Sequence, residues 1–425
     1  DRGVYTAGYV AVAESTGGAR SRSLVGTPAG AGQARSGSWS LRIMRWPYPS
    51  VALGAACLLV PLAGAPGARA ADLPLAPEPI DHVRVCAAFG LGFYVIPGTD
   101  TCVRISARAR VDYNVFDYDS LLAESFGANG TFSRAANAYR MLARTNVYFD
   151  SRTATAFGLL RTYADLDFRY VTPAFGAAPA TGVFVLGSAY VTLGGFQFGR
   201  AQSRYDFVDG FFAPGQAFLS AGSDLTTNLA AYTARFGDGL SVSLSLEDDA
   251  ARRYGLAANA AFQGGYAGAR FPDPVANLRV EADWGSAQVM GALHDVRARF
   301  VSDSALAFAV GGGVVANLPV GRATSAGVQA TFTRGALQYA SSTIAGGRRL
   351  GGTFYGPNDA IIDANGDLEL SDGFGALAGF STGLFGNTSL GVEAGYVLVD
   401  QAETDLDGDG TPDDLDFQSF AVDGS

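Results

Sequence analysis

The stretch Cys102-Val-Arg-Ile-Ser-Ala-Arg-Ala-Arg-Val-Asp112 alternates small or aliphatic residues with polar or charged ones. Side chains of a β-strand point to opposite faces in turn, so the arginines share one face and the aliphatic residues share the other. An arginine face suits water, whereas an aliphatic face suits lipid. The stretch therefore predicts a strand of a sheet that is wet on one side and apolar on the other.

This alternation recurs along the chain, in segments 140–150, 160–169, 241–247, 278–284 and 389–398. A soluble sandwich of two sheets can also alternate. It would seldom keep arginines and acids on one face and bare aliphatic side chains on the other in strand after strand. We therefore predict an all-β fold, a transmembrane antiparallel β-barrel with a water-filled interior.

The composition agrees with this fold class. Glycine is abundant, with 56 residues spread along a chain of 425, and this disfavours a helical protein because glycine breaks helices. After about residue 70, no apolar run approaches the ~20 residues that a membrane-spanning helix needs. The net charge of -10 argues against a general nucleic-acid-binding protein, which usually carries a basic face.

The predicted connections alternate between short and long, which is typical of an outer-membrane barrel. Short turns contain Gly194-Gly195, Gly237-Asp238-Gly239, Gly285-Ser286 and Gly386-Asn387. Long stretches lie near 113–138, 169–182, 201–227, 249–277, 334–373 and 400–416. This pattern predicts about 13 strands by residue 399 and a fourteenth beginning near Phe417. Because an open edge in lipid leaves unpaired backbone groups, we expect residues 102–425 to be a C-terminally truncated barrel that lacks two or three strands.

The segment Met44–Ala70 has the features of a secretory signal peptide. Arg42 and Arg45 supply positive charge, 51–62 is a short apolar core, and Ala68-Arg69-Ala70 is a small-x-small cleavage pattern. An N-terminal membrane anchor is the alternative, and the short core disfavours it. Residues 1–43 are then an upstream or disordered leader, and 71–101 a periplasmic N-terminal segment.

Three cysteines remain to be explained. Cys57 lies in the apolar signal core, where an acylated lipoprotein cysteine is the alternative, although apolar residues follow it. Cys86 and Cys102 are then the pair left in an exported chain, and we predict a disulfide between them. Closing a loop of about 15 residues stabilises by about 3 kcal/mol in the chain-entropy model. Two free thiols are the alternative.

The Cys-bounded block Val85-Cys-Ala-Ala-Phe-Gly-Leu-Gly-Phe-Tyr-Val-Ile-Pro-Gly-Thr-Asp-Thr-Cys-Val-Arg-Ile105 resembles the N-terminal signature of the alphaproteobacterial porins of the rhizobial and Brucella type. Segments 198–203, 231–240, 243–248, 271–276 and 284–286 resemble the same family, so the likeness runs from Ala71 to the C-terminus. The resemblance implies about 16 strands, a trimer, and a third loop folded into the lumen. The chain departs from the family by lacking a terminal strand that ends in Phe.

The resemblance also implies that the loop after the fifth strand narrows the pore. Here that loop is about 201–227, and its charged residues are Arg204, Asp206, Asp209 and Asp224. The opposing wall would consist of the inward arginines Arg104, Arg108, Arg110, Arg140, Arg144 and Arg161. Arginines facing loop carboxylates would set a transverse field that sorts solutes. The alternative is that some of these residues are ordinary solvated charges at the rims.

An acidic segment in a predicted outer loop has the spacing of a calcium loop. Alternate carboxylates around a glycine turn offer the oxygen ligands that Ca²⁺ prefers. The residues are Asp405, Asp407, Asp409, Gly410, Asp413 and Asp416. An acidic solvated loop is the alternative, and Asp363-x-Asn365-x-Asp367-x-Glu369 is a weaker copy. No cofactor is required by the predicted fold.

Enzymatic chemistry has little support in the sequence. The two histidines, His82 and His294, lie far apart, and no Gly-x-Ser-x-Gly elbow accompanies them; His294 is expected to face the lumen near a strand end. We predict a multi-pass channel of the bacterial outer membrane for passive diffusion of small hydrophilic solutes and ions, not an enzyme. Its expected partners are two further copies, outer-membrane lipid and lipopolysaccharide, with no nucleic acid. Alternatives are a channel specific for sugars or carboxylates, a barrel enzyme, and an adhesin.

Overall fold

The computed structural model describes residues 84–115, 139–172, 180–208, 221–342, 348–350, 353–385 and 388–424. The predicted leader 1–43, the signal peptide 44–70 and the segment 71–83 lie outside these residues, as do Cys57 and His82. Among the described residues, no helix has the length and apolar content that crossing a membrane requires.

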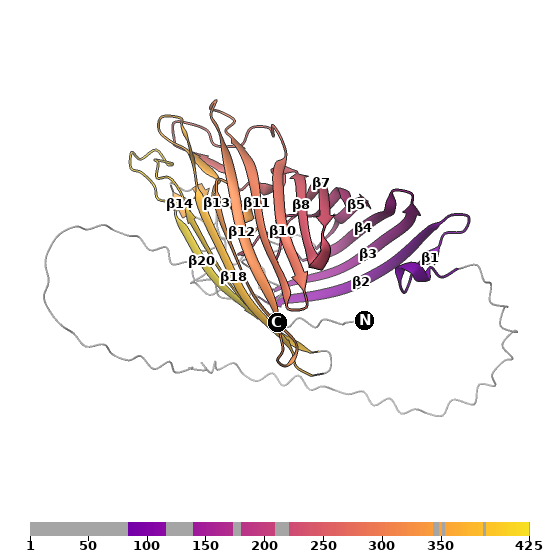
Figure 1. Cartoon of the computed structure of the whole chain (residues 1–425). Coiled ribbons are helices and arrows are strands. Elements are labelled where there is room, and N and C mark those ends of the chain that lie inside the picture. The colour runs from indigo at the N-terminus through magenta and orange to yellow at the C-terminus, as the bar shows by residue number, and fades with distance from the viewer. Residues whose placement is uncertain are drawn as a thin grey trace, which may run out of the picture. The chain divides into compact units, whose positions relative to one another are not determined.

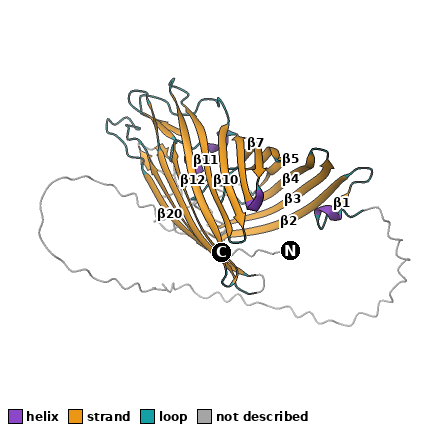
Figure 2. Cartoon of the chain, in the orientation of Figure 1, coloured by secondary structure: helices purple, strands orange, loops and turns teal. Residues whose placement is uncertain are grey.

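Strands dominate the described part of the chain (Figure 2). One large sheet contains fifteen strands, and hydrogen-bonded neighbours follow the order of the chain (Figure 1). These strands are β1 (Tyr94–Val95), β2 (Thr101–Val115), β3 (Tyr139–Thr155), β4 (Gly158–Val171), β5 (Thr181–Leu193), β6 (Phe196–Gln202), β7 (Thr226–Arg235), β8 (Leu240–Glu247), β10 (Asp273–Ala282), β11 (Gly285–Arg297), β12 (Ser304–Leu318), β13 (Arg322–Arg334), β18 (Asp372–Gly383), β19 (Ser389–Asp400) and β20 (Phe417–Gly424).

The remaining elements are short and belong to the connections. They are the strands β9 (Leu256–Ala258), β14 (Arg348–Leu350), β15 (Thr353–Tyr355), β16 (Ala360–Ile362) and β17 (Leu368–Leu370), and the 3-10 turns η1 (Ala87–Phe89), η3 (Gly237–Gly239), η4 (Asp249–Arg252) and η5 (Leu337–Tyr339). β16 pairs with β9 in parallel and with β17 in antiparallel fashion, which joins two long connections into one small sheet.

The predicted strand count is confirmed for the described residues. Apart from the two-residue β1, thirteen strands of the large sheet precede residue 401, and β20 begins at Phe417. The predicted long connections coincide with the gaps between strands, and Gly194-Gly195 and Gly237-Asp238-Gly239 form turns. Gly285 instead begins β11, after a turn at Asp283-Trp284, and Gly386-Asn387 lies outside the described residues.

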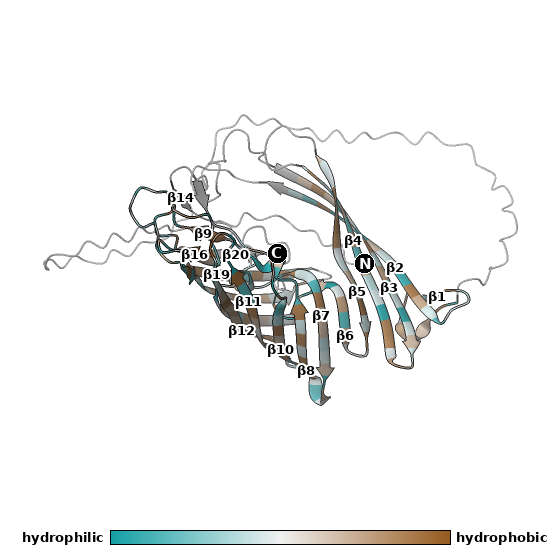
Figure 3. Cartoon of the chain, turned by 90° about the horizontal axis from the view of Figure 1, so that it is seen from above, coloured by the Kyte–Doolittle hydropathy of each residue, from teal (hydrophilic) through white to brown (hydrophobic). Residues whose placement is uncertain are grey.

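The two faces of the large sheet differ as predicted. Partners in register share a face, and alternate apolar side chains on one face are exposed, such as Ile105 at 52% and Leu246 at 51%. On the opposite, inner face, polar side chains such as Asn146, Asp167 and Gln329 are buried. Figure 3 shows this alternation as hydrophilic and hydrophobic bands along the strands. The burial of polar side chains and exposure of apolar ones is the reverse of a soluble sandwich.

One part of the inner face is nevertheless apolar. We call the inner faces of β10–β13, β18 and β19 the covered wall, because connecting segments pack on it. Met290 and Val296 of β11 are buried there against Tyr205, Tyr339 and Ile362 of the connections. The alternation predicts charged and polar side chains on the inner face, and this prediction is wrong for the covered wall. Side chains under a folded loop lose contact with water, so apolar residues are stable there.

Candidate functional site

Among the side chains that the structure describes, seven arginines line the inner faces of β2, β3 and β4, which we call the arginine wall. They are Arg104, Arg108, Arg110, Arg144, Arg152, Arg161 and Arg169. In the register of β2 and β3, Arg104 lies opposite Asp150, Arg108 opposite Asn146, and Arg110 opposite Arg144. Residues directly opposite in an antiparallel pair point to the same side, so this register brings the predicted arginines together on one face. Arg152 and Arg169 were not among the predicted site residues.

Carboxylates on the same wall neutralise most of these arginines. Asp150, whose side chain is buried, lies 2.9 Å from both Arg152 and Arg161 and 3.7 Å from Arg104. Asp167 lies 2.5 Å from Arg169. Arg144 Nε lies 3.6 Å from the same carboxylate, and Arg110 lies 2.6 Å from Asp112. The described arginines of this wall therefore pair mainly with carboxylates of the wall itself, and the predicted transverse field toward the loop stays a prediction.

Arg108 differs from its neighbours. It is exposed, and no ion-pair partner for it is found among the described residues. Its register partner is the neutral Asn146, whose amide donates to Asp165 at 2.9 Å. Arg108 therefore differs from the paired arginines of the wall, because it presents an exposed guanidinium on the inner face.

The N-terminal segment packs on the short-turn end of the arginine wall. A disulfide joins Cys86 to Cys102, as predicted. It holds Phe93, which is buried, against the guanidinium groups of Arg104 and Arg152, at 4.9 and 4.7 Å from the ring centre. Arg104 thus lies beside the disulfide-linked segment, close to the turn that follows β3, and the sequence pattern alone did not show this neighbour.

The third long connection folds onto the inner face, as predicted. β6 ends at Gln202, and the chain then crosses the covered wall, where side-chain amides of the strands hold its backbone. Asn277 of β10 donates to the Arg204 carbonyl at 2.5 Å. Gln288 of β11 donates to the Tyr205 carbonyl at 3.1 Å, and Val208 N–H donates to Gln329 Oε1 of β13 at 2.9 Å.

Glycines in the strands make room for this loop. A Cβ at Gly313 would lie 2.9 Å from the Phe207 ring, and one at Gly311 would lie 3.0 Å from the Tyr205 hydroxyl. A Cβ at Gly395 would lie 2.8 Å from Ala221, on the returning part of the loop. Glycine inside a strand often marks the close approach of another backbone. The glycines inside these strands are visible in the sequence, although no approach of a loop was predicted from them.

Asp206 was predicted to lie in the pore constriction, and its side chain is buried and holds the two ends of the loop together. Its carboxylate accepts from Leu225 N–H at 2.8 Å and from the Ser223 hydroxyl, which ties the two ends of the loop together. Arg252, fully buried and absent from the predicted site, lies 3.4 Å from the same carboxylate. Burial raises the pKa of Asp206, and Arg252 is the strongest opposing influence. A carboxylate with this many donors stabilises the loop.

The other predicted loop and wall residues have different outcomes. Asp224 is exposed, and its carboxylate accepts from the Gln202 amide at 3.0 Å. Asp209 lies outside the described residues, as does the side chain of Arg140. Of the loop carboxylates that the structure describes, Asp224 is the exposed one.

His294 faces inward, but loops cover it. Its side chain is buried, and Nδ1 lies 2.9 Å from Asp273. The Tyr339 hydroxyl donates to Asp273 at 2.8 Å, and the Tyr266 hydroxyl donates to Asp359 at 2.7 Å. Burial raises the pKa of Asp359, with His294 as the strongest opposing influence. The expected lumen-facing histidine is therefore part of a buried network that fastens connections to the covered wall.

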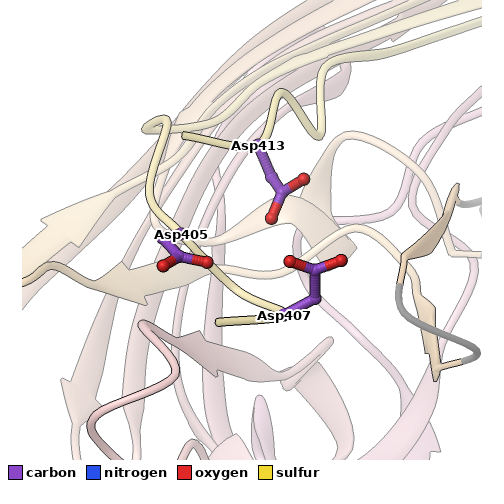
Figure 4. Close-up of side chains that lie close together, drawn as sticks. All are labelled: Asp405, Asp407 and Asp413. Carbon is purple, nitrogen blue, oxygen red and sulfur yellow. The ribbon is translucent and has the colours of Figure 1, made fainter. Parts of the chain in front are cut away.

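Three carboxylates of the acidic loop between β19 and β20 converge (Figure 4). One oxygen of each of Asp405, Asp407 and Asp413 lies within 4.8 Å of the others. Asp409 is not part of this group, and its carboxylate accepts from Thr411 N–H at 2.8 Å. Asp416 accepts from Gln401 N–H at 2.9 Å instead. The donor set is all oxygen, which suits Ca²⁺, but it is smaller than the predicted one.

Comparison of the sequence with known families finds one match. The model of a family described as "Porin subfamily" matches residues 72–403. Porin Omp2b of Brucella suis biovar 1 (strain 1330) is 31% identical over 249 residues, covering 56% of this chain and 63% of that protein. Porin Omp2b of Brucella abortus (strain 2308) gives the same values. The chain thus spans 63% of the length of these curated relatives.

A solved structure has a similar fold. The crystal structure of the outer membrane channel DcaP of Acinetobacter baumannii superposes with a TM-score of 0.51 at 15% sequence identity. The match covers 76% of this chain and 97% of that one. At this identity, the likeness concerns the fold alone.

Proposed function

We propose that this chain, which belongs to the porin subfamily, forms a passive outer-membrane pore for small hydrophilic solutes and ions. The single observation that carries this proposal is the orientation of the large sheet. Its apolar side chains are exposed, whereas its inner face carries arginines, carboxylates and amides. A sheet with these two faces fits a site between lipid and water. A channel performs no bond chemistry, so the proposal requires no catalytic group.

The inward loop supplies the proposed constriction. It occupies the covered wall, so the remaining passage lies between this loop and the arginine wall. Charged groups along a narrow aqueous passage sort solutes by charge and polarity. The wall provides exposed Arg108 and the paired arginines, and the loop provides exposed Asp224. Because arginine stays protonated at any relevant pH, this field does not titrate away.

We extend the proposal to the assembly and location of the protein. Outer-membrane residence with several membrane-crossing strands is supported by the exposed apolar band, which lipid and lipopolysaccharide chains would cover. A homotrimer is the assembly that the family resemblance implies. Chemical crosslinking of the protein in native outer membranes tests it, and a dimer or monomer as the sole species would contradict it.

We also propose that Ca²⁺ braces the loop between β19 and β20 through Asp405, Asp407 and Asp413. The converging oxygens support this. We expect calcium to slow proteolysis of residues 400–417, and we expect the double variant Asp405→Asn/Asp407→Asn to lose this effect. Asp363→Asn, in the weaker copy, is the matched control. Equal cleavage with calcium and with a chelator would remove the calcium site.

Planar-bilayer conductance of the full-length protein tests the pore itself. Large, ohmic, step-like openings are expected, and absence of conductance from correctly folded protein would overturn the proposal. A series of sugars and carboxylates separates the second candidate, a substrate-specific channel, from a general one. Saturable block by one solute class would favour the specific channel. A polar cavity near the short-turn ends of β4–β11 also favours it.

A further inference from the structure

A second polar region lies on the inner face beside the arginine wall. It is a cavity of about 690 Å³ near the short-turn ends of β4–β11. Its lining includes the four guanidinium groups of Arg161, Arg204, Arg235 and Arg279. Its size falls within the range of about 300–1,000 Å³ that is usual for small-molecule sites.

Two of these arginines already have a carboxylate partner. Arg161 lies 2.9 Å from Asp150, and Arg279 lies 2.7 Å from Glu281. The other acid in the lining is Asp206, which is buried and engaged by Arg252. These pairs leave the cavity with more cationic than anionic groups available to a solute.

Arg204 has no such partner. Its guanidinium donates to the neutral Gln197 amide oxygen, and no carboxylate lies within ion-pair distance of it among the described residues. The Nε atom of Arg204 is buried and has no hydrogen-bond partner among the residues that the structure describes. Glu247 accepts from the Arg204 backbone N–H at 2.8 Å, and its charge offsets that of the guanidinium in part without forming an ion pair with it.

Arg235 is the other arginine of the cavity without a carboxylate partner among the described residues. It is exposed at the end of β7, lines the same cavity, and likewise has no ion pair within the residues that the structure describes. Burial lowers the pKa of Arg204, Glu247 opposes this, and the nearby Arg235 lowers it further. The two guanidinium groups therefore repel each other across the cavity, and an anion between them would relieve this repulsion.

We propose that this cavity binds the oxyanion group of a small solute, with Arg204 and Arg235 as the side chains that contact it. The proposal rests on the pore function above and names the class of solute that the pore selects. Guanidinium groups bind carboxylate and phosphate oxygens through paired N–H donors. The ring of Tyr190 and the Asn277 amide offer further contacts for the rest of the solute. A neutral sugar would leave both charges uncompensated.

Calorimetry on the detergent-solubilised protein tests the site without relying on conductance. The probes are succinate, inorganic phosphate, glucose, and chloride at matched ionic strength. We expect saturable binding of succinate, of phosphate or of both, which separates the two sources of oxyanion. Arg204→Gln/Arg235→Gln should weaken this binding by at least about tenfold. Arg322→Gln, an exposed arginine at a short turn that does not line the cavity, is the control for the loss of an arginine charge elsewhere.

Bilayer recordings of the same proteins distinguish the two proposals. Saturable block of open channels by succinate or phosphate, reduced in the double variant and kept in Arg322→Gln, supports the site. Open channels without saturable binding overturn the oxyanion site and leave the pore. Oxyanion binding in calorimetry without conductance overturns the pore. Binding of glucose alone, or equal effects of chloride and succinate, contradicts the site, as does an equal loss in both variants.

Discussion

The arginine wall and the covered wall belong to one sheet and obey the same alternation, yet they meet different surroundings. On the arginine wall, the inner side chains pair with one another, and Arg108 reaches open solvent. On the covered wall, apolar side chains such as Met290, amides such as Gln288 and glycines such as Gly313 pack against loops. The comparison teaches that a strand pattern predicts which face is inward. It does not predict whether that face meets water or a loop.

The largest expected effect comes from removing an aromatic ring beneath the inward loop. Tyr205 is fully buried on the covered wall, 4.7 Å from the Tyr339 ring. Tyr205→Ala should lower the free energy of unfolding by about 3–5 kcal/mol, because it leaves a cavity that the loop cannot fill. Urea unfolding of the protein in detergent measures this change. Tyr170→Ala, which removes an outward ring on β4, is the control. An equal loss of unfolding free energy in both variants would contradict the greater stabilisation by the ring beneath the loop.

The disulfide anchors the other wall. Cys86→Ser/Cys102→Ser should lower the free energy of unfolding by about 3 kcal/mol, because the unfolded chain gains the freedom of an open loop. The wild type should migrate more slowly on reducing than on non-reducing gels. Cys57→Ser, in the predicted signal peptide, is the control. Identical mobility under both conditions, with two thiols open to alkylation, would remove the disulfide.

Two adjacent glycines of β12 compare the inner and outer faces directly. A Cβ at Gly311 would lie 2.6 Å from Thr331 Oγ1 and 3.0 Å from the Ala330 carbonyl, whereas one at Gly312 would meet no atom closer than 3.4 Å. Gly311→Ala should therefore destabilise by about 1–3 kcal/mol through overpacking, and Gly312→Ala by less. The same urea unfolding measures both. A larger loss of stability in Gly312→Ala than in Gly311→Ala would contradict the packing of the loop on the inner face of β12.

The smallest energetic effect is expected on the arginine wall. Arg104→Ser/Arg108→Ser/Arg144→Ser should reduce the permeability of anions relative to cations by about threefold. This ratio corresponds to a free-energy difference below about 1 kcal/mol, and it is small because water screens exposed charges. Reversal potentials under a salt gradient report this ratio. Arg108→Ser alone should give most of the change, since Arg104 and Arg144 lie near carboxylates. An unchanged reversal potential in the triple variant would exclude these residues from the selective region.

Much of the sheet could be predicted from sequence, because strand alternation and connection length are local signals. Strand β20 begins at the predicted Phe417, and the Cys86–Cys102 pair is bonded. Loop side chains carry no such period. Nothing local distinguishes Asp206, which is fastened to Arg252, from Asp224, which is exposed, because the difference arises from donors far along the chain.

The same limit applies to Arg252, which has no strand pattern around it and is buried only through long-range contacts. Glycine was the one usable clue. Gly311 and Gly313 stand in the middle of β12, and a glycine inside a strand often indicates where another segment approaches.

The amides that hold the inward loop have a consequence for the order of assembly. Gln288 and Gln329 are separated by 83 and 121 positions from the loop residues they bind. Contacts this distant in sequence form late, because a long stretch of chain must first be brought together. The loop is therefore expected to dock only after β11 and β13 have joined the sheet, so the passage would narrow late in the assembly of this part of the molecule.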